Sequence, residues 1–116
     1  MSAVAEVSVE RQGPAVVAHL SGEVDMTNAG YVGDELRSSV PNDAAMLVID
    51  LAETRYIDSA AIGLLFELAR RLGRRRQSLR LVVPETSPLG RVLEITEIQT
   101  AAPVHPSLSS ALGESA

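Results

Sequence analysis

Residues 47–71, LVIDLAETRYIDSAAIGLLFELARR, decide the fold because they join two kinds of secondary structure through a short polar connection. The continuous apolar run at 44–51 predicts a strand that is covered on both faces. From Ser59 to about Arg75, apolar residues recur at helical spacing. The expected inner face of this helix comprises Ile62, Leu65, Phe66, Ala69 and Leu72. Asp58 and Ser59 therefore stand where the strand's exit loop becomes a helix.

The flanking segments extend this alternation of strands and helices. Residues 4–10 and 15–22 predict an antiparallel hairpin that turns at Gly13-Pro14. A helix is expected over 28–40 with Thr27 as its N-cap, and a strand over 79–83. The next segments predict a third helix with Ser87 as cap and Pro88 at its first position, then a short strand at 102–104 and a helical turn at 107–112. The third helix is expected to bury Leu89, Val92, Leu93 and Thr96.

This order predicts an α/β fold in one domain that spans residues 1–116. A mixed, mostly parallel sheet of about five strands opens with the antiparallel hairpin and is flanked by about four helices. A chain of 116 residues is long enough to bury a core without metal or disulfide staples. Residues 1–3 and 113–116 are expected to be flexible.

The composition excludes several classes of function. The chain has no cysteine and only two histidines, so neither a disulfide nor a metal site is expected, and we expect no cofactor. A net charge of −5 argues against nucleic acid as a partner. No apolar run approaches the roughly 20 residues that a membrane span needs. Residues 1–10 carry glutamates in place of a basic leader, so a cytoplasmic protein without membrane insertion is expected.

Three acidic residues are candidates for chemistry around Ser59. In parallel sheets, loops at the carboxyl ends of the strands form the sites, so we expect Asp25, Asp50 and Asp58 to converge there. Each has an ordinary alternative role, because Asp and Ser are frequent turn and cap residues. His19 is expected within a strand and His105 at the surface, so neither histidine is placed to act as a base for Ser59.

Enzyme motifs are absent around these residues. The sequence contains neither a GxSxG elbow nor a phosphate-binding loop with lysine, which argues against a hydrolase. A phospho-receiver needs a lysine that contacts the phosphoryl group, and all ten basic residues here are arginine. An enzyme would require turnover that depends on Asp25 or Asp58, and no enzymatic activity is expected.

The segments LSGEVDMTNA, LVIDLAETRYIDSAAIG and SPLGRVLEITEIQTAAPVHPSLSSAL together resemble the STAS domain of bacterial anti-sigma factor antagonists (anti-anti-sigma factors). The resemblance covers nearly the whole chain. In that family a strand that ends in Asp is followed by Asp-Ser-(Ser/Thr)-Gly-Leu-Gly at a helix N-terminus. The resemblance makes Ser59 the phosphoacceptor. Residues expected to support the phosphosite or contact a partner are Glu23, Asp25, Asp58, Ala60, Ala61, Ile62 and Gly63.

Three positions depart from the family pattern. Ala60 replaces a second hydroxyl residue, and Ala61 replaces a glycine, which adds a methyl where a partner's backbone is expected to approach. Glu97 stands where the family usually has glycine after the third helix, so a different C-cap is expected there. The effect of these departures on partner affinity stays open.

The resemblance implies a regulator that works by partner switching and is itself a phosphoprotein. The unphosphorylated form binds an anti-sigma factor, usually a GHKL-type serine kinase, and so frees a sigma factor for transcription. Phosphorylation of Ser59 ends the binding, and a PP2C-type phosphatase restores it. The alternative is a STAS scaffold or accessory subunit, of a stressosome-like or lipid-transport assembly, that is not switched at Ser59. A monomer or weak dimer is expected.

Three further features bear on partner binding. The unpaired N–H groups of a helix N-terminus are expected to hold a phosphate on Ser59, while the added charge acts at the interface. The arginine run at 69–76, ARRLGRRR, either complements the helix dipole or contacts an acidic partner. Leu64 and Leu68 are further partner contacts if they are exposed.

Overall fold

The computed structural model describes residues 4–113 and contains the expected order of elements. Residues 1–3 and 114–116 of the expected flexible ends lie outside the described residues. The elements are β1 (Ala5–Gln12), β2 (Ala15–Val24), α1 (Ala29–Ser38), β3 (Met46–Ile57), α2 (Ser59–Arg74), β4 (Ser78–Val82), α3 (Gly90–Thr96), the 3₁₀ turn η1 (Ile98–Thr100), β5 (Val104–His105) and α4 (Leu108–Ala111).

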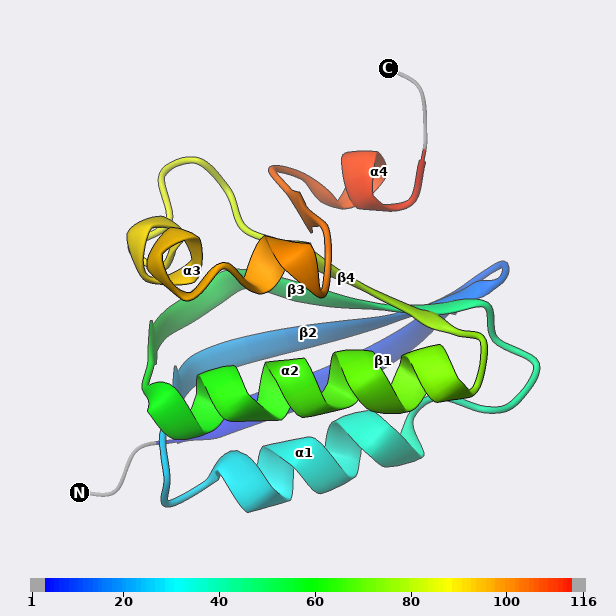
Figure 1. Ribbon diagram of the computed structural model, residues 1–116, viewed down its shortest axis with the longest axis horizontal. Coiled ribbons are helices and arrows are strands. Elements are labelled where there is room, and N and C mark those ends of the chain that lie inside the picture. The colour runs from blue at the N-terminus through cyan, green and yellow to red at the C-terminus, as the bar shows by residue number, and fades with distance from the viewer. Residues whose placement is uncertain (1–3, 114–116) are drawn as a thin grey trace.

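The five strands form one sheet in the order β1-β2-β3-β4-β5. Strands β1 and β2 pair antiparallel, with Ala5 opposite Gly22 and Gln12 opposite Ala15, and the remaining pairs are parallel. Helices α1 and α2 lie side by side along one face of this sheet (Figure 1). The mixed sheet with an opening hairpin is therefore confirmed.

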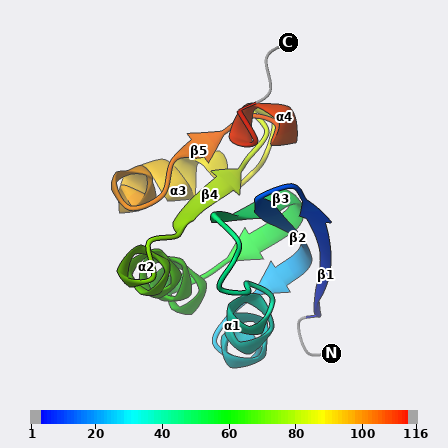
Figure 2. The same cartoon turned by 90° about the vertical axis from the view of Figure 1, so that its right-hand side faces the viewer.

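Helices cover the two faces of the sheet unequally. Figure 2 shows α1, α2 and α3 on one side, with α4 near the opposite side of β4. The main core lies under the first three helices and includes Leu36, Leu47, Leu68 and Leu93. A small second core lies where α4 meets the other face and contains Ala15, Val17, Val48, Val82 and Ala111. Beyond α4 the second face carries polar side chains.

The buried face of α2 is rotated from the expected one. Ala61, Leu65, Leu68 and Leu72 are buried. The expected inner residues Ile62, Phe66 and Ala69 are only partly buried and pack against the edge of the core. The apolar stripe of this helix is wider than one face, so spacing alone did not select its centre.

Strand β3 is longer than expected, because it continues from Leu51 through residues 52–57 where a loop was predicted. The β2–β3 register shifts twice, between His19 and Ser21 and between Gly22 and Glu23. Thr54 is buried in this irregular stretch, and its hydroxyl donates to the carbonyl of Leu20 at 2.6 Å. These bulges carry the strand to Asp58, at the edge where the site lies.

The register shift between Gly22 and Glu23 also explains why position 22 is a glycine. Its φ is +95°, and a Cβ at this position would lie 2.1 Å from the carbonyl oxygen of Val4. A side chain would therefore push β1 away from β2 beside the loop that follows.

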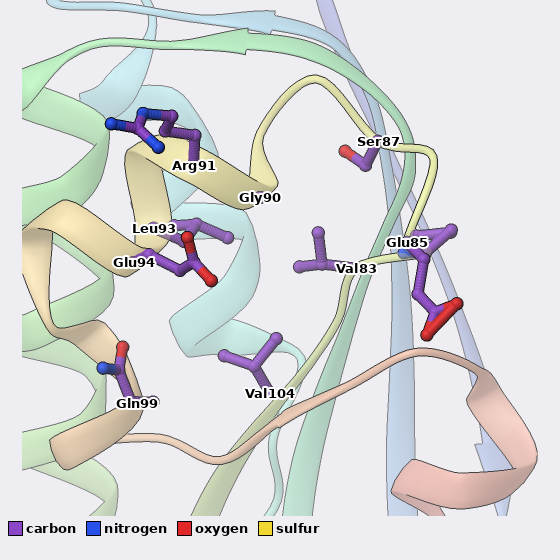
Figure 3. Close-up of a pocket in the computed structure, with 10 residues that line it drawn as sticks. Val83, Glu85, Ser87, Gly90, Arg91, Leu93, Glu94, Gln99 and Val104 are labelled. Atoms are coloured by element: carbon purple, nitrogen blue, oxygen red, sulfur yellow. The ribbon is translucent and has the colours of Figure 1, made fainter.

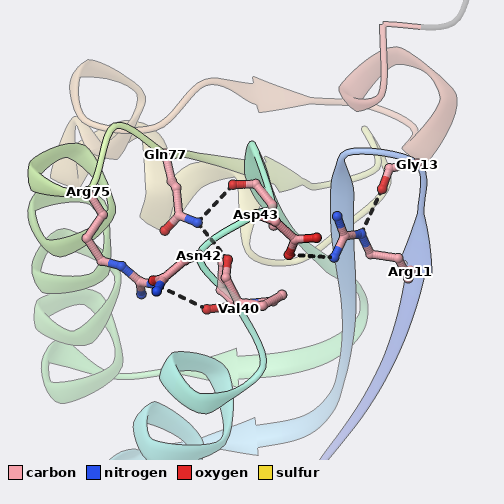
Figure 4. A network of polar contacts seen from close by, with 9 residues as sticks. Arg11, Gly13, Val40, Asn42, Asp43, Arg75 and Gln77 are labelled. Atoms are coloured by element: carbon pink, nitrogen blue, oxygen red, sulfur yellow. Dashed lines mark hydrogen bonds and ion pairs between the residues drawn. The ribbon is translucent and has the colours of Figure 1, made fainter.

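The opposite end of the sheet is held by side chains that bond to the α1–β3 connection (Figure 4). The buried amide of Gln77 donates to the carbonyls of Pro41 and Ala44, at 2.9 and 2.8 Å. Arg75 donates to the side chain of Asn42. The start of β4 and the end of α2 are thus tied to one loop.

Helix α3 begins later than the sequence indicated. The Ser87 hydroxyl accepts the N–H of Leu89 at 3.1 Å, but the regular helix starts at Gly90. Leu89 and Leu93 are buried as expected, whereas Val92 points outward and is 39% exposed, so its assignment to the inner face was wrong. No helix among residues 4–113 is long and apolar enough to cross a bilayer.

Glu97 ends α3 in the left-handed conformation, with φ 57° and ψ 32°. A non-glycine residue in this conformation carries a steric cost of roughly 1–2 kcal/mol. The expectation of a different C-cap is therefore wrong, because Glu97 adopts the conformation that a glycine would take at this position.

We expect Glu97→Gly to raise the free energy of unfolding by about 0.5–1 kcal/mol, because relief of left-handed strain exceeds the added entropy of the unfolded chain. The matched control is Glu94→Gly, an exposed position inside the same helix. It should lower stability by about 0.5–1 kcal/mol. Urea unfolding measures both, and a destabilised Glu97→Gly would contradict the strain argument.

Candidate functional site

Asp58, and not Ser59, is the N-cap of α2. Its backbone is extended, and its Oδ1 accepts the N–H groups of Ala60 and Ala61 at 2.9 and 3.1 Å. Its Oδ2 accepts the N–H of Met26 at 3.0 Å. One carboxylate therefore starts the helix and fastens the loop that follows β2.

The loop after β2 is built from its own side chains. Asp25 Oδ1 accepts the N–H of Thr27 at 2.8 Å and also the Thr27 hydroxyl. Asn28 accepts the N–H of Asp25 at 3.0 Å and donates to the carbonyl of Glu23 at 2.9 Å. Hydrogen bonds from Thr27 lower the pKa of Asp25 below its ordinary value, so this carboxylate stays ionised.

Thr27 is not the N-cap of α1, contrary to the sequence prediction. The helix starts at Ala29, and the preceding Asn28 makes no side-chain capping bond. Thr27 bonds to Asp25 instead, which closes an Asx turn beside Asp58. The residue thus shapes the candidate site and does not start the helix.

Ser59 is the first residue of α2 and is exposed to solvent. Within residues 4–113 its hydroxyl makes no hydrogen bond. Because Asp58 already supplies the cap, the Ser59 hydroxyl has no structural task in the helix. It lies open to a second molecule next to Asp58, whose carboxylate also holds the loop that contains Asp25.

The residues after Ser59 separate into exposed and buried positions. Ala60 and Ile62 are partly buried, and Gly63 is exposed with no atom within 4 Å of a Cβ built there. Ala61 is only 3% exposed and belongs to the main core. The expectation that its methyl faces a partner is wrong, because that methyl points into the protein.

Leu64 and Leu68 were expected to contact a partner only if they are exposed. Leu68 is 1% exposed, so it is not a partner contact. Leu64 packs against the core, and its Cδ1 lies 2.8 Å from a Cβ built on Gly33, where α1 passes α2, but its side chain is only partly buried.

Asp50 does not reach the site. It lies within β3 and its Oδ2 contacts His19 Nδ1 at 2.8 Å, while His19 Nε2 contacts Glu10 Oε1 at 2.6 Å. This cluster spans β1, β2 and β3 on the face that carries polar side chains. The prediction failed because β3 continues seven residues beyond Asp50, from Leu51 to Ile57.

The three N–H groups that follow Ser59 in α2 are not available to hold a phosphate. Those of Ala60 and Ala61 bond to Asp58 Oδ1, and that of Ile62 bonds to the Asp58 carbonyl at 3.0 Å. The expectation that a phosphate on Ser59 rests in unpaired helix amides is therefore wrong for these three groups. A phosphate here would keep its charge exposed toward solvent or a partner.

Sequence reasoning missed two exposed side chains beside the site. Met26 is 79% exposed although its backbone is fixed to Asp58, and Tyr56 is 52% exposed next to Glu23 in the β2–β3 ladder. Neither belongs to a periodic pattern, so only their position at the ends of β2 and β3 could have pointed to them. They add apolar surface to an acidic neighbourhood.

The chain has a cleft elsewhere, with a volume of about 590 Å³, between the segment that follows β4, α3, η1 and β5. Figure 3 shows Val83, Leu93 and Val104 around this hollow and Glu85 and Gln99 at its margin. It includes none of the residues around Ser59. No group of three or more histidine, cysteine, aspartate or glutamate residues in the described part of the chain is arranged to hold a metal ion.

Comparison with known proteins identifies the family. The model of the STAS domain family matches residues 6–111, so the chain belongs to the STAS domain family. No curated protein sequence matches the chain.

Solved structures share the fold. An anti-sigma factor antagonist from Mycobacterium paratuberculosis is 24% identical with a TM-score of 0.84, over 95% of this chain and 92% of that one. The unphosphorylated anti-sigma factor antagonist SpoIIAA is 16% identical with a TM-score of 0.73, over 92% and 93%. The phosphorylated Bacillus cell fate determinant SpoIIAA is also 16% identical, with a TM-score of 0.65, over 93% and 97%. At these identities the likeness establishes the fold alone.

Substitutions at the joint should separate the cap from the hydroxyl. We expect Asp58→Ala to lower the free energy of unfolding by about 2 kcal/mol, because three N–H groups lose their acceptor. Ser59→Ala, the neighbouring control, should change it by less than about 0.5 kcal/mol. Urea unfolding of both variants tests this assignment, and a larger loss for Ser59→Ala would make the serine the cap.

The His19 cluster should make stability depend on pH. Contacts with Glu10 and Asp50 raise the pKa of His19 above its ordinary 6.5, so this stabilisation is complete below 6.5 and is lost as pH rises through the folded pKa. The hydrogen bond with His19 lowers the pKa of Glu10 below 4.5. The stability that Glu10 contributes is therefore lost as pH falls through this lowered pKa. His19→Gln should therefore destabilise most between pH 4.5 and 6.5.

Urea unfolding of the wild type and His19→Gln at pH 5.5 and 8.5 measures the effect. Glu10→Gln should reduce the difference between the two pH values, because it removes the carboxylate at Nε2. An identical loss of stability for His19→Gln at both pH values would contradict the assignment.

Proposed function

We propose that this protein is an anti-sigma factor antagonist controlled by phosphorylation of Ser59. Its unphosphorylated form binds an anti-sigma factor that is also a serine kinase of the GHKL type, and this binding releases a sigma factor. Phosphorylation of Ser59 by the bound kinase ends the interaction. A PP2C-type phosphatase removes the phosphate and restores binding.

The observation that carries this proposal is the exposed, unbonded hydroxyl of Ser59 at the first position of α2. A serine at a helix start ordinarily serves as a cap, and here Asp58 has that role. The hydroxyl is therefore accessible to a kinase, and its modification leaves the capping bonds intact. The fold can stay the same in both states.

Charge provides the switch. A phosphate adds about −1.5 to −2 at neutral pH, next to Asp58 and Asp25. The neighbouring helix amides are already bonded, so the protein itself offers little compensation for this charge. Placing it in an interface shaped for a neutral hydroxyl costs several kcal/mol in desolvation and repulsion. About 5.5 kcal/mol moves a population from 99:1 to 1:99.

The docking surface of the proposal surrounds the hydroxyl. It includes the exposed or partly exposed Ser59, Ala60, Ile62 and Gly63. Met26 adds an apolar side chain on a backbone that is held by Asp58, so a partner that covers it has to order only the side chain. Glu23 and Asp25 support this surface through the loop bonds around Asn28.

The comparisons support the same role. The Mycobacterium paratuberculosis structure is described as an anti-sigma factor antagonist, and SpoIIAA has been solved in both an unphosphorylated and a phosphorylated form. The kinase and phosphatase classes come from the resemblance of the 58–63 motif to that family.

The first test is phosphorylation. The anti-sigma factor is isolated by its binding to Ser59→Ala, then incubated with the wild-type chain and ATP, and the products are analysed by mass spectrometry. We expect one phosphate on Ser59 and release of the complex. Ser59→Ala should stay bound in the presence of ATP, because it offers no acceptor.

Affinity measurements complete this test. Ser59→Asp should fold like the wild type but bind the anti-sigma factor at least tenfold more weakly than Ser59→Ala. Equal affinity of the two variants would argue against a charge switch. A wild-type chain that binds its partner and never acquires phosphate at Ser59 would favour the scaffold role.

A further inference from the structure

Four arginines near the end of α2 form a cationic surface that the fold does not use. Arg70, Arg71, Arg74 and Arg76 are exposed, and none of them forms an ion pair with the residues that the structure describes. They make up four of the ten basic residues in a chain of net charge −5. We call this group the arginine surface.

Hydrogen bonding at the helix end does not account for these arginines, although Arg71 and Arg74 lie in the last turn, where cations complement the helix dipole. The end of α2 is completed by the backbone, because the N–H of Gln77 bonds to the Leu72 carbonyl at 2.8 Å and that of Arg76 bonds to the Gly73 carbonyl at 3.1 Å. Arg76 takes the left-handed conformation of this motif, with φ 59°. The helix therefore ends without any bond from an arginine side chain of this surface.

The arginine surface continues the exposed stripe that begins at Ser59. At 3.6 residues per turn, Ser59, Gly63, Arg70 and Arg74 fall on one side of α2, and all four are exposed. Helix α2 runs along the sheet (Figure 1), and its bounds place Ser59 at its start and Arg71 and Arg74 in its last turn. The rise per residue puts Arg70 about 16 Å and Arg74 about 22 Å along the axis from Ser59.

That separation rules out a direct bond between the arginines and a phosphate on Ser59. The separation is smaller than the width of a typical protein–protein interface, because an interface of about 800 Å² per protein has a diameter of about 32 Å. The one acid in the middle of the stripe, Glu67, is paired with Arg37 at 3.1 Å, and this arginine also pairs with Asp34, so the acid is partly compensated. A partner centred on the helix would touch both ends of the stripe.

We propose that the partner that docks at Ser59 extends along α2 and presents an acidic protein surface to Arg70 and Arg74, with Arg71 and Arg76 at its edge. This inference rests on the proposed docking at Ser59. Guanidinium groups bind carboxylates in bidentate pairs, and complementary charge at one end of the stripe fixes the orientation of the partner and speeds its association. Four charges on a chain of net −5 suit an acidic protein surface better than the polyphosphate backbone of a nucleic acid.

The first experiment uses a probe that does not depend on Ser59. A glutamate dodecapeptide is titrated into the ¹⁵N-labelled chain, and backbone and arginine Nε signals are followed by NMR. We expect the largest shifts at 70–76. Arg70→Gln/Arg74→Gln should weaken binding of the peptide at least fivefold, and the control pair Arg11→Gln/Arg91→Gln, with the same change in charge, less than twofold.

Rival anions decide the class of partner. Vesicles that contain phosphatidylglycerol and a 20-base-pair DNA duplex are titrated under the same salt conditions. If vesicles or DNA shifted the NMR signals of residues 70–76 at a lower concentration than the peptide does, the assignment to a protein surface would be overturned. If the peptide shifted the NMR signals of all arginines equally, the arginine surface would not be a specific binding site.

The second experiment uses the anti-sigma factor that binds the unphosphorylated chain. Arg70→Gln/Arg74→Gln should slow its association at least fivefold and reduce its salt dependence, whereas the control pair should not. Unchanged association would overturn the shared docking surface. Failure of Ser59 phosphorylation, by contrast, would affect the proposed function and leave the peptide result unaltered.

Discussion

The carboxylate of Asp58 is the interaction on which the rest of this site depends. One side chain accepts two N–H groups that start α2 and one from the loop after β2. These bonds bring together segments more than 30 residues apart in the sequence, since Met26 and Asp58 are separated by 32 positions. Because the aspartate performs this architectural task, the adjacent serine hydroxyl is left without one. Accessibility of Ser59 is thus a consequence of how its neighbour is used.

Irregular pairing between β2 and β3 determines where the joint between β3 and α2 lies. At the two register shifts between β2 and β3, β3 contains extra residues that have no partner in β2. Both strands still end together, with Val24 opposite Ile57. The buried Thr54 hydroxyl supplies a bond to Leu20 where the ladder is disturbed. The bulged half of β3 lies beyond the end of β4, which pairs only as far as Asp50. The site therefore stands on an extension of the sheet that β4 does not reach, formed by β2 and β3 with the start of β1 beside β2.

Much of this fold was predictable from patterns of apolar residues, and the errors have identifiable causes. The spacing of apolar residues predicted the strands and helices in their order along the chain, and the motif around Ser59 indicated the joint between β3 and α2. It failed at 52–57, where bulges break the alternation on which strand prediction relies. It also failed for Thr27 and Ala61, because side-chain hydrogen bonds and the exact rotation of α2 are tertiary properties.

Gly63 has a consequence for engineering. It lies one turn beyond Ser59, and no atom approaches the position that a Cβ would take. A larger residue would meet no packing obstacle, and leaving glycine at an internal helical position typically gains up to about 1 kcal/mol in helix propensity. The position can therefore hold a protrusion that a redesigned partner accommodates with a matching hollow. If a partner docks at Ser59 as proposed, a change at this one residue, which does not contact the core, would distinguish one such pair from another.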